Sequence, residues 1–291
     1  MQSQTTPIEV IEQEKKLVKE LANLTAEDEV IFNDSGWDSR VYSTNGGQYF
    51  FKFPRSDKIR KRYEHQIAVL KLVANIDPKV KVPKVIWEHP NNDYFGYEGV
   101  RGAALEDIVP TLDEAAKQII GRTIGEFLRQ FHQLELPGAR DVTVEQEIKQ
   151  FQEWYEPAVP VIQKAFSEAE QIKLKRLVSI VWPSELLKLG RDAALCHGDL
   201  HFSNIMYGSI GQLGIIDFGD VGYYDRSKDF IDLDEHHIFE SALEAYGDNK
   251  ELRQKIAMRQ KVTHVITLTA AIGKQDEPGI QKTLAKLRAA I

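Results

Sequence analysis

A carboxylate, an amide five residues later and a second carboxylate after an apolar run stand close together in this 291-residue sequence. They are Asp199, Asn204 and Asp217. Phosphoryl transfer to an alcohol uses three such groups, because one carboxylate accepts the hydroxyl proton while an amide oxygen and a second carboxylate hold Mg²⁺ against the nucleotide phosphates. Mg²⁺ prefers oxygen ligands and keeps several waters, so one Asn and one Asp suffice as protein ligands. The sequence therefore predicts Asp199 as the base and Asn204 and Asp217 as metal ligands.

Short apolar segments around these residues predict the strands that position them. Residues 193–196 predict a buried strand, and the polar residues 197–203 predict a loop. Residues 205–207 predict a returning strand, and residues 213–216 predict another that ends at Asp217. Two hairpin-like strands are expected to bring the base and both metal ligands to one end of a small sheet.

Two motifs carry a resemblance to a known family. The spacing from His197 through Asp199 to Asn204 matches the kinase pattern H-x-D-x-x-x-x-N, and Asp217-Phe218-Gly219 matches the kinase D-F-G element. His-Gly-Asp in place of His-Arg-Asp resembles the aminoglycoside phosphotransferase and choline kinase-like group. The continuation from Gly214 to Asp220, then Asp225 and Asp229-Phe230, resembles the aminoglycoside 2″-phosphotransferase branch in particular.

The resemblance implies an α+β, two-lobed protein kinase-like fold. Residues 1–99 are expected to form a small mixed lobe with an antiparallel sheet, and residues 100–291 a larger, mostly helical lobe with the catalytic loop and acceptor pocket. A chance cluster of turn-forming Asp and Asn residues is one alternative, which the order of the two motifs opposes. A relative that binds nucleotide without turnover is another, which the complete set of Lys, Glu, Asp, Asn and Asp residues opposes.

Phosphate-binding residues are expected in the first lobe. Alternation predicts a strand over 48–53 with Lys52 among phenylalanines, and three- and four-residue spacing predicts a helix over 59–74. In kinases such a lysine binds the α- and β-phosphates and pairs with a helix glutamate. Glu64 is the candidate partner. The basic residues at 58 and 60–62 predict a solvated helix face.

The resemblance also implies where the nucleoside triphosphate, ATP or GTP, binds. A turn with Ser35 and Gly36 would cover the phosphates, although it lacks a full G-x-G-x-x-G pattern. Strands predicted over 82–87 and 94–99 would lead to a hinge, where the backbone of Glu98 and Val100 would meet the nucleobase. Backbone recognition has no side-chain code, so this placement depends on the resemblance alone.

Helices dominate the expected second lobe. Thr111 to Glu114 match a capping box before an amphipathic helix. Residues 144–187 predict helices broken at Pro157 and Pro160, a segment that the resemblance implies as a wall of the acceptor pocket. Trp154 and Tyr155 precede the break, and we expect them in the core, with the pocket wall as the alternative. Residues 253–291 predict two or three closing helices.

A small-molecule acceptor is expected because the chain lacks the long activation segment and A-P-E element of protein kinases. Four acids near the metal site could hold acceptor amines, with a solvated helix face as the alternative: Asp220, Asp232, Glu235 and Glu240. An aminoglycoside antibiotic is the first expectation, and choline, sugars, macrolides and fructosamines are the alternatives within the fold. Asp229 is expected to brace the catalytic loop.

Composition limits the other functions. A net charge of −7 opposes nucleic-acid binding, whose footprint is a basic stripe, and permits a cationic substrate. No apolar run approaches the roughly 20 residues that cross a bilayer, and the start shows no signal-peptide pattern. The single cysteine, Cys196, excludes an internal disulfide and suits a reducing cytoplasm. We expect it to be a buried residue rather than a nucleophile paired with His197.

Overall fold

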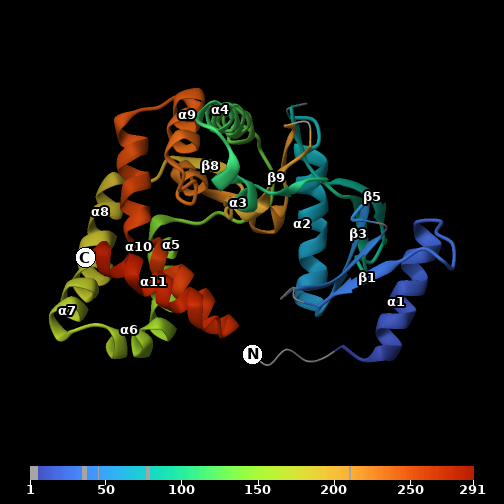
Figure 1. Cartoon of the computed structure of the whole chain (residues 1–291), viewed down its shortest axis with the longest axis horizontal. Coiled ribbons are helices and arrows are strands. Elements are labelled where there is room, and N and C mark those ends of the chain that lie inside the picture. The colour runs from blue at the N-terminus through green and yellow to red at the C-terminus, as the bar shows by residue number, and fades with distance from the viewer. Residues whose placement is uncertain (1–5, 35–37, 45, 77–78, 210) are drawn as a thin grey trace.

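The chain folds into two lobes, a small one built on a sheet and a larger helical one (Figure 1). The computed structural model describes residues 6–34, 38–44, 46–76, 79–209 and 211–291. This is the kinase-like architecture that the sequence predicts, with an antiparallel sheet near the N-terminus and a mostly helical C-terminal part. In the described part, no helix is both long and apolar enough to cross a membrane.

The small lobe contains a five-stranded antiparallel sheet of order β1-β2-β3-β6-β5. Its strands are β1 (Val30–Asn33), β2 (Ser39–Thr44), β3 (Tyr49–Pro54), β5 (Lys84–Glu88) and β6 (Phe95–Glu98). Successive side chains of a strand point to opposite faces. Phe51 and Phe53 of β3 therefore pack in a buried cluster with Val18 of helix α1 (Ile8–Leu21), while Phe50 and Lys52 face the other way.

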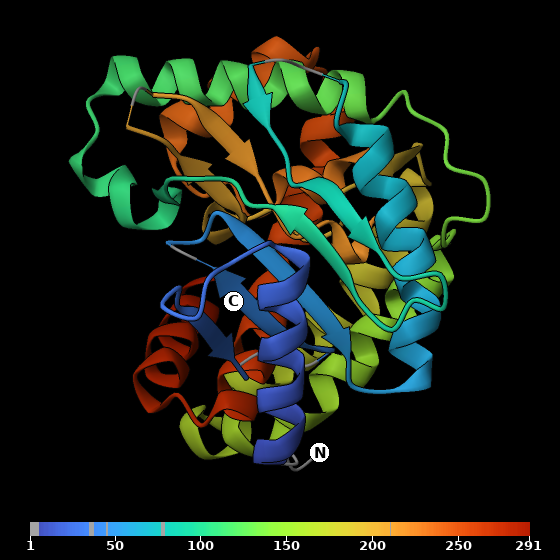
Figure 2. The same ribbon diagram turned by 90° about the vertical axis from the view of Figure 1, so that its right-hand side faces the viewer.

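Helix α2 (Asp57–Val73) covers the sheet face opposite α1, as the two views show (Figures 1 and 2). Ser56 caps its start by accepting a hydrogen bond from the backbone N–H of Ile59. The apolar residues at three- and four-residue spacing are buried, and Tyr63 packs edge-on against Phe95. The predicted helix over 59–74 is therefore confirmed.

A second sheet joins the lobes. Its order is β4-β10-β9-β7, with the strands β4 (Val80–Lys81), β7 (Ala103–Ala104), β9 (Ile205–Tyr207) and β10 (Leu213–Ile215). Strand β4 precedes the expected boundary at residue 99, yet it pairs in parallel with β10 of the large lobe. A third, two-stranded sheet pairs β8 (Ala193–Cys196) with β11 (Gly222–Asp225).

The large lobe is built mainly from helices. They are α3 (Leu105–Ile108), α4 (Glu114–Phe131), α5 (Val144–Tyr155), α6 (Val159–Ala165), α7 (Glu168–Arg176), α8 (Trp182–Leu189), α9 (His236–Tyr246), α10 (Lys250–Lys274) and α11 (Glu277–Ala289). Short 3₁₀ turns lie at Val109–Thr111, Glu156–Ala158, Phe202–Asn204, Phe218–Asp220 and Arg226–Phe230, and a π-helical turn lies at Leu177–Val181. The two closing helices after residue 250 match the prediction.

Two helix starts show how local chemistry sets the boundaries. The cap of α4 is Asp113, which accepts from the backbone N–H of Ala116, so the predicted capping box at Thr111 is wrong by two residues. Pro157 and Pro160 each lie in the first turn of a new helical segment after α5. Proline is tolerated there because the first N–H groups of a helix have no intrahelical partner.

Helices α4 and α9 pack at backbone distance. Gly121 and Gly125 lie one turn apart on α4, where a Cβ atom would collide with the carbonyl oxygens of Ile238 and Ala242 on α9. This contact belongs to a buried cluster that continues from α4 and α9 through Phe218 to α2. A second cluster holds α5 to α8 against α10 and α11. The predicted helical insertion thus has a core of its own.

Candidate functional site

The predicted catalytic loop, residues 197–203, follows strand β8, which ends at Cys196. Buried hydrogen bonds hold it in place. The ring Nε2 of His197 lies 2.9 Å from the carbonyl oxygen of Ile216, directly before Asp217. This hydrogen bond therefore connects the start of the loop to the residue before the D-F-G element. Cys196 is fully buried, and burial raises the pKa of its thiol, as expected for a packing residue rather than a nucleophile.

Asp229 supports this loop through hydrogen bonds to its backbone. Its carboxylate accepts the backbone N–H groups of His197 at 2.7 Å and Gly198 at 2.9 Å, and it lies 3.0 Å from His132 Nε2. Burial opposes the charge of Asp229, but the hydrogen bond with His132, the neighbouring histidines and the backbone N–H groups lower its pKa overall. The expected bracing contacts of Asp229 are therefore present in the structure.

Asn204 and Asp217 lie on neighbouring strand ends. The pairing of Ile205 with Ile215 continues as a hydrogen bond from the Ile216 N–H to the Asn204 carbonyl. The amide nitrogen of Asn204 donates to the backbone oxygen of Asp199 at 2.9 Å, which orients its side chain and leaves its amide oxygen for another partner. This donor set of amide and carboxylate oxygens fits Mg²⁺, although a metal role for either residue stays a prediction.

Asp217 has a strained backbone. Its φ of 63° and ψ of 59° lie in the left-handed region, which L-residues other than Gly, Asn and Asp seldom adopt. Its side chain is 55% exposed. Such conformations persist where the surrounding structure enforces them, and they cluster at functional sites. Here the following 3₁₀ turn, Phe218–Asp220, buries the Phe218 ring beside His197.

Asp199 lies at the cleft with a histidine beside it. His201 Nε2 is 3.5 Å from Asp199 Oδ2 and 3.1 Å from the amide nitrogen of Asn204, so it either donates to Asp199 or accepts from Asn204. Hydrogen bonding to His201 lowers the pKa of Asp199, and the same bond raises the pKa of His201. The lowered pKa favours the ionised form of Asp199.

Lys52 reaches the site from the small lobe, but its partner differs from the predicted one. Its ammonium lies 3.8 Å from Asp217 Oδ1. Burial opposes the charge of Lys52, but Tyr97 and Asp217 outweigh it and raise the pKa. Glu64 is exposed on α2, and among the described residues it makes no ion pair with Lys52.

Gln66, two residues further along α2, occupies the expected place instead. It is buried and lines a cavity of about 20 Å³ together with Lys52 and Asp217. Two residues turn a helix by about 200°, so Glu64 and Gln66 cannot share a face. We predicted Glu64 because a glutamate is the usual partner of such a lysine. The helix instead places Gln66, and not Glu64, on the side that faces Lys52.

Arg62 also departs from its expected place on a solvated face. Its guanidinium lies 2.7 Å from Asp38, 3.4 Å from the Gly219 carbonyl oxygen and 3.8 Å from Asp220. It therefore links the sheet of the small lobe to the residues that follow Asp217.

The predicted nucleotide residues fall into two groups. Ser35 and Gly36 lie outside the described residues. Glu98 ends β6 and Val100 lies in the link between the lobes, where it packs so closely on Gly214 of β10 that a Cβ there would collide with it. Recognition of the nucleobase by this link stays a prediction.

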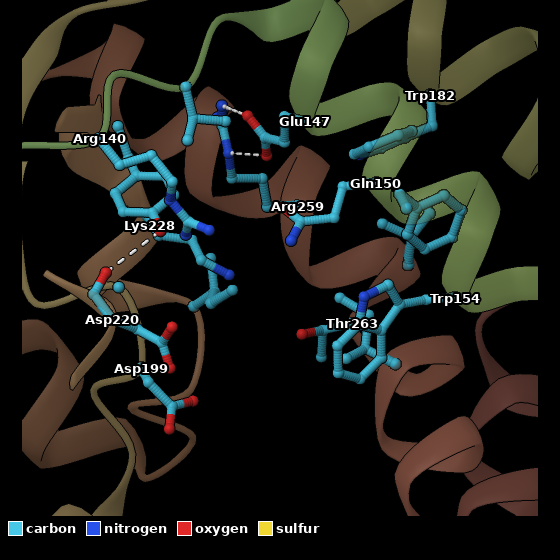
Figure 3. Close-up of a pocket in the computed structure, with 17 residues that line it drawn as sticks. Arg140, Glu147, Gln150, Trp154, Trp182, Asp199, Asp220, Lys228, Arg259 and Thr263 are labelled. Atoms are coloured by element: carbon cyan, nitrogen blue, oxygen red, sulfur yellow. Dashed lines mark hydrogen bonds and ion pairs between the residues drawn. The ribbon is translucent and has the colours of Figure 1, made fainter. Parts of the chain in front are cut away.

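A cavity of about 300 Å³ opens beside Asp199, and we name it the aromatic cavity (Figure 3). Its defining residues are Arg140, Phe151, Trp154, Trp182, Asp199 and Lys228. Figure 3 shows Arg140, Lys228, Asp220 and Asp199 on one side and Trp154 and Trp182 on the other. Of the two aromatic residues before the helix break, Tyr155 packs in the core, whereas Trp154 is 40% exposed and lines this cavity.

A larger cavity of about 980 Å³, the polar cavity, adjoins the aromatic cavity and shares Ile231 and Thr263 with it. Its defining residues are His201, Ser203, Asp232, Asp234, His264 and Lys286. Burial raises the pKa of Asp232, and the charge of Asp199 acts in the same direction. Asp220 and Asp232 thus line one cavity each.

The other two predicted acceptor acids have structural partners. Glu235 caps α9 by accepting the Ile238 N–H at 2.8 Å, and it lies 3.3 Å from Lys117 Nζ. Glu240 binds Arg253 through two hydrogen bonds of 3.0 and 2.7 Å. Among the described residues, neither glutamate lines the aromatic or the polar cavity. Their placement among the acceptor ligands is corrected accordingly, because residue type and closeness in sequence do not show which way a side chain points.

Fold and site together define a kinase-like phosphotransferase. Residues 29–257 match the phosphotransferase enzyme family, APH, so the chain belongs to that family. It is an enzyme of the phosphotransferase class.

Solved structures with the same fold cover almost the whole chain. The GDP and kanamycin complex of APH(2″)-IIIa is 19% identical with a TM-score of 0.76, over 96% of this chain and 98% of that one. The gentamicin complex of APH(2″)-IIa is 17% identical with a TM-score of 0.66, over 98% and 96%. A macrolide 2′-phosphotransferase type I is 16% identical with a TM-score of 0.67, over 99% of both chains. At these identities the similarity establishes the fold.

Proposed function

We propose that this enzyme transfers the γ-phosphoryl group of ATP or GTP to a hydroxyl group of a small molecule. The observation that carries the proposal is the arrangement of Asp199, Asn204 and Asp217 at one end of a sheet with Lys52 opposite. Family membership and the nucleotide complexes of similar structures support the donor.

Each residue has a role that its surroundings support. Asp199, ionised beside His201, accepts the hydroxyl proton and aims the oxygen at the γ-phosphorus. Lys52 binds the phosphates from the small lobe. Asn204 and Asp217 would hold Mg²⁺, which when bound neutralises charge on the phosphates. Positioning and charge stabilisation account for most of the rate in such a reaction.

Two acceptor classes are candidates. The first is an aminoglycoside-like cationic acceptor, of the antibiotic-resistance type. The carboxylates of the polar cavity support it, since four acids line this cavity against three lysines: Glu106, Asp232, Asp234 and Asp276 against Lys274, Lys282 and Lys286. The second is a ring compound without a dense set of amines, which the lining of the aromatic cavity favours. Both acceptors offer a hydroxyl to Asp199, so the reaction is the same.

Asp199→Asn tests the reaction. The variant should fold and bind Mg²⁺-nucleotide like the parent but lose roughly 10²–10⁴ in kcat, because asparagine cannot accept the proton. Nucleotide consumption with an acceptor panel measures kcat, and calorimetry with and without Mg²⁺ measures binding. Near-parental turnover by the folded variant would show that Asp199 is not the base.

The metal assignment has its own control. Asp217→Ala should abolish the dependence of nucleotide affinity on Mg²⁺, whereas Asp220→Ala, three residues further on, should leave it in place. Equal nucleotide affinity of the parent in EDTA and in Mg²⁺ would remove the metal from the proposal.

A further inference from the structure

Of the two cavities beside the catalytic loop, the aromatic cavity is the one that Asp199 lines. Asp199 and Gly198 line the aromatic cavity. The polar cavity is lined by His201, and among the described residues Asp199 does not contribute to it. A hydroxyl must come within hydrogen-bond distance of its base, so the lining of the aromatic cavity bears directly on the acceptor.

The charges of the aromatic cavity do not suit a polyamine. Three cations, Arg140, Lys228 and Arg259, and three carboxylates line it, so it has no net charge. Glu147, at the top of the view in Figure 3, accepts two hydrogen bonds from Arg259, of 2.8 and 2.7 Å.

Among the described residues, neither of the remaining two cations has a carboxylate within ion-pair distance. The charge of Lys228 acts on Asp199 and Asp232 without direct contact, and the Arg140 guanidinium lies over the Tyr224 ring, 5.2 Å from its centroid. An ammonium group in the cavity would meet both of these cations on the same side as Asp199 and Asp220, so the two carboxylates would not act on it alone. Like charges close together in a partly desolvated site disfavour the wrong ligand.

The opposite wall consists of aromatic rings and includes the indole N–H of Trp182, a hydrogen-bond donor. Phe151 and Trp182 pack with ring centroids 4.7 Å apart, and Trp154 adds a partly exposed face. Trp182 is 2% exposed, and its indole Nε1 has no hydrogen-bond partner. Figure 3 shows this indole pointing from α8 toward the cavity. A buried N–H without a partner is costly and calls for an acceptor oxygen.

We propose that the acceptor is a mostly apolar ring compound that carries the reacting hydroxyl and a hydrogen-bond-accepting oxygen group, a carboxylate or a neutral carbonyl. Its ring lies against Trp154 and Phe151 on the wall that carries the Trp182 N–H, and its acceptor oxygen group faces the donors Lys228 and Arg140 on the other wall. This inference rests on the proposed phosphoryl transfer. The hydroxyl oxygen bonds to the γ-phosphorus, its proton goes to Asp199, and the bond to the β–γ bridging oxygen breaks so that the nucleoside diphosphate leaves with that electron pair.

Matched benzyl alcohols test the acceptor class. The full chain is assayed for diphosphate release with Mg²⁺-ATP and Mg²⁺-GTP and four acceptors: 4-(hydroxymethyl)benzoate, its methyl ester, 4-(aminomethyl)benzyl alcohol and kanamycin. We expect the carboxylate or the ester to exceed both amines at least tenfold in kcat/KM. The carboxylate arm and the ester arm distinguish an anionic from a neutral oxygen group. A preference for either amine, or no turnover of any ring alcohol, overturns the inference.

Variants locate the binding. Lys228→Met should lower kcat/KM for the carboxylate at least tenfold and that for the ester less than threefold, whereas the matched control Lys286→Met in the polar cavity should change neither. Quenching of tryptophan fluorescence by the probes, lost in Trp154→Phe, reports binding without turnover. Equal effects of Lys228→Met and Lys286→Met would contradict the placement.

The two proposals fail in different ways. Turnover of kanamycin alone removes the ring acceptor and leaves the phosphotransferase reaction standing. Absence of Mg²⁺-dependent nucleotide binding, together with absence of any acceptor turnover, removes the reaction as well.

Discussion

At the scale of single residues, the lysine of β3 depends on a neighbour that residue type alone does not reveal. Lys52 lies opposite Asp217, and the nearby buried residue on α2 is Gln66, not Glu64. A neutral amide there leaves the ammonium of Lys52 free to bind phosphate and Asp217. Glu64 is exposed and serves as an internal control.

Alanine variants measure this arrangement. Lys52→Ala should lower kcat/KM at least tenfold, and Gln66→Ala should lower it less, because it loses packing and a polar contact rather than the charge. Glu64→Ala should stay within twofold of the parent. The double variant Lys52→Ala with Glu64→Ala should show additive losses, since residues that do not touch act independently. A loss smaller than the sum would indicate that Glu64 reaches Lys52.

The pair Asp199 and His201 gives the reaction a defined pH dependence. Asp199 must be ionised to accept a proton, and the hydrogen bond with His201 lowers its pKa. In the His201→Asn variant the pKa of Asp199 should return toward its ordinary value. The acid limb of the pH profile of kcat/KM should therefore move to higher pH.

A pH–rate profile of parent and variant from pH 4 to 9 checks this. His237→Asn, whose imidazole lies 3.6 Å from Glu114 away from both cavities, is the matched control and should leave the limb in place. An acid limb that stays at the parental pH in His201→Asn would exclude His201 from setting the charge of Asp199.

At the scale of elements, α4 and α9 pack closely together and belong to the same buried cluster as Leu200 and Phe202 of the catalytic loop. Gly→Ala in a helix normally gains about 1 kcal/mol from propensity. At Gly121 and Gly125 the added methyl would meet the α9 backbone, which cannot rotate away as a side chain can. Overpacking of this kind costs roughly 1–3 kcal/mol, so either variant should lower the free energy of unfolding.

Gly273 on α10 provides the comparison. A Cβ there has no neighbour within 4 Å, so Gly273→Ala should be neutral or stabilise by roughly 0.4–1 kcal/mol. Denaturant unfolding of the three variants separates the two effects. If Gly121→Ala and Gly273→Ala shift stability in the same direction, close packing of α4 on α9 is not what requires the glycine.

At the scale of the whole molecule, one buried cluster runs through both lobes. It includes Leu70 of α2 and Leu128 of α4, each 6% exposed or less. Because the cluster is continuous, the small lobe is not expected to unfold by itself. Leu70→Ala and Leu128→Ala should each cost roughly 2–5 kcal/mol and shift the same cooperative transition.

Thermal unfolding monitored by far- and near-UV circular dichroism tests this. Ile119→Ala on the exposed face of α4, where the side chain is 65% exposed, is the control and should change the free energy of unfolding by less than about 0.5 kcal/mol. A separate early transition in Leu70→Ala would show that the lobes melt independently.

The sequence predicted those parts of the fold that local patterns determine. Periodic apolar residues predicted α2, α4 and the closing helices, and the loop spacing placed Asp199, Asn204 and Asp217 at one sheet end. The two-residue strands β4 and β7 were not predicted, because their pairing with distant strands, and not their own composition, makes them strands.

The acceptor side was the least predictable part of the site. The aromatic cavity draws its walls from α5, α8, α10 and the loop before α5, and no linear spacing relates them. We predicted Glu235 and Glu240 as acceptor ligands, but Glu235 caps a helix and Glu240 forms an ion pair with Arg253. Both interactions depend on the folded structure and cannot be read from the sequence. The adjacent aromatic residues Trp154 and Tyr155 did indicate a possible pocket wall. Which of the two lines the cavity depends on the face of α5 on which each lies, and that residue is Trp154.

The parallel pairing of β4 with β10 has a mechanical consequence. Val80 and Lys81 of the small lobe are hydrogen-bonded to the strand that ends two residues before Asp217. The two lobes are thus hydrogen-bonded to each other close to Asp217, so we expect any opening of the cleft to be a rotation about this pairing rather than a separation of the lobes. Because Asp217 lies near this pairing and Lys52 lies on β3 of the other sheet, such a rotation would move the lysine away from Asp217 while the carboxylate stayed near its present position.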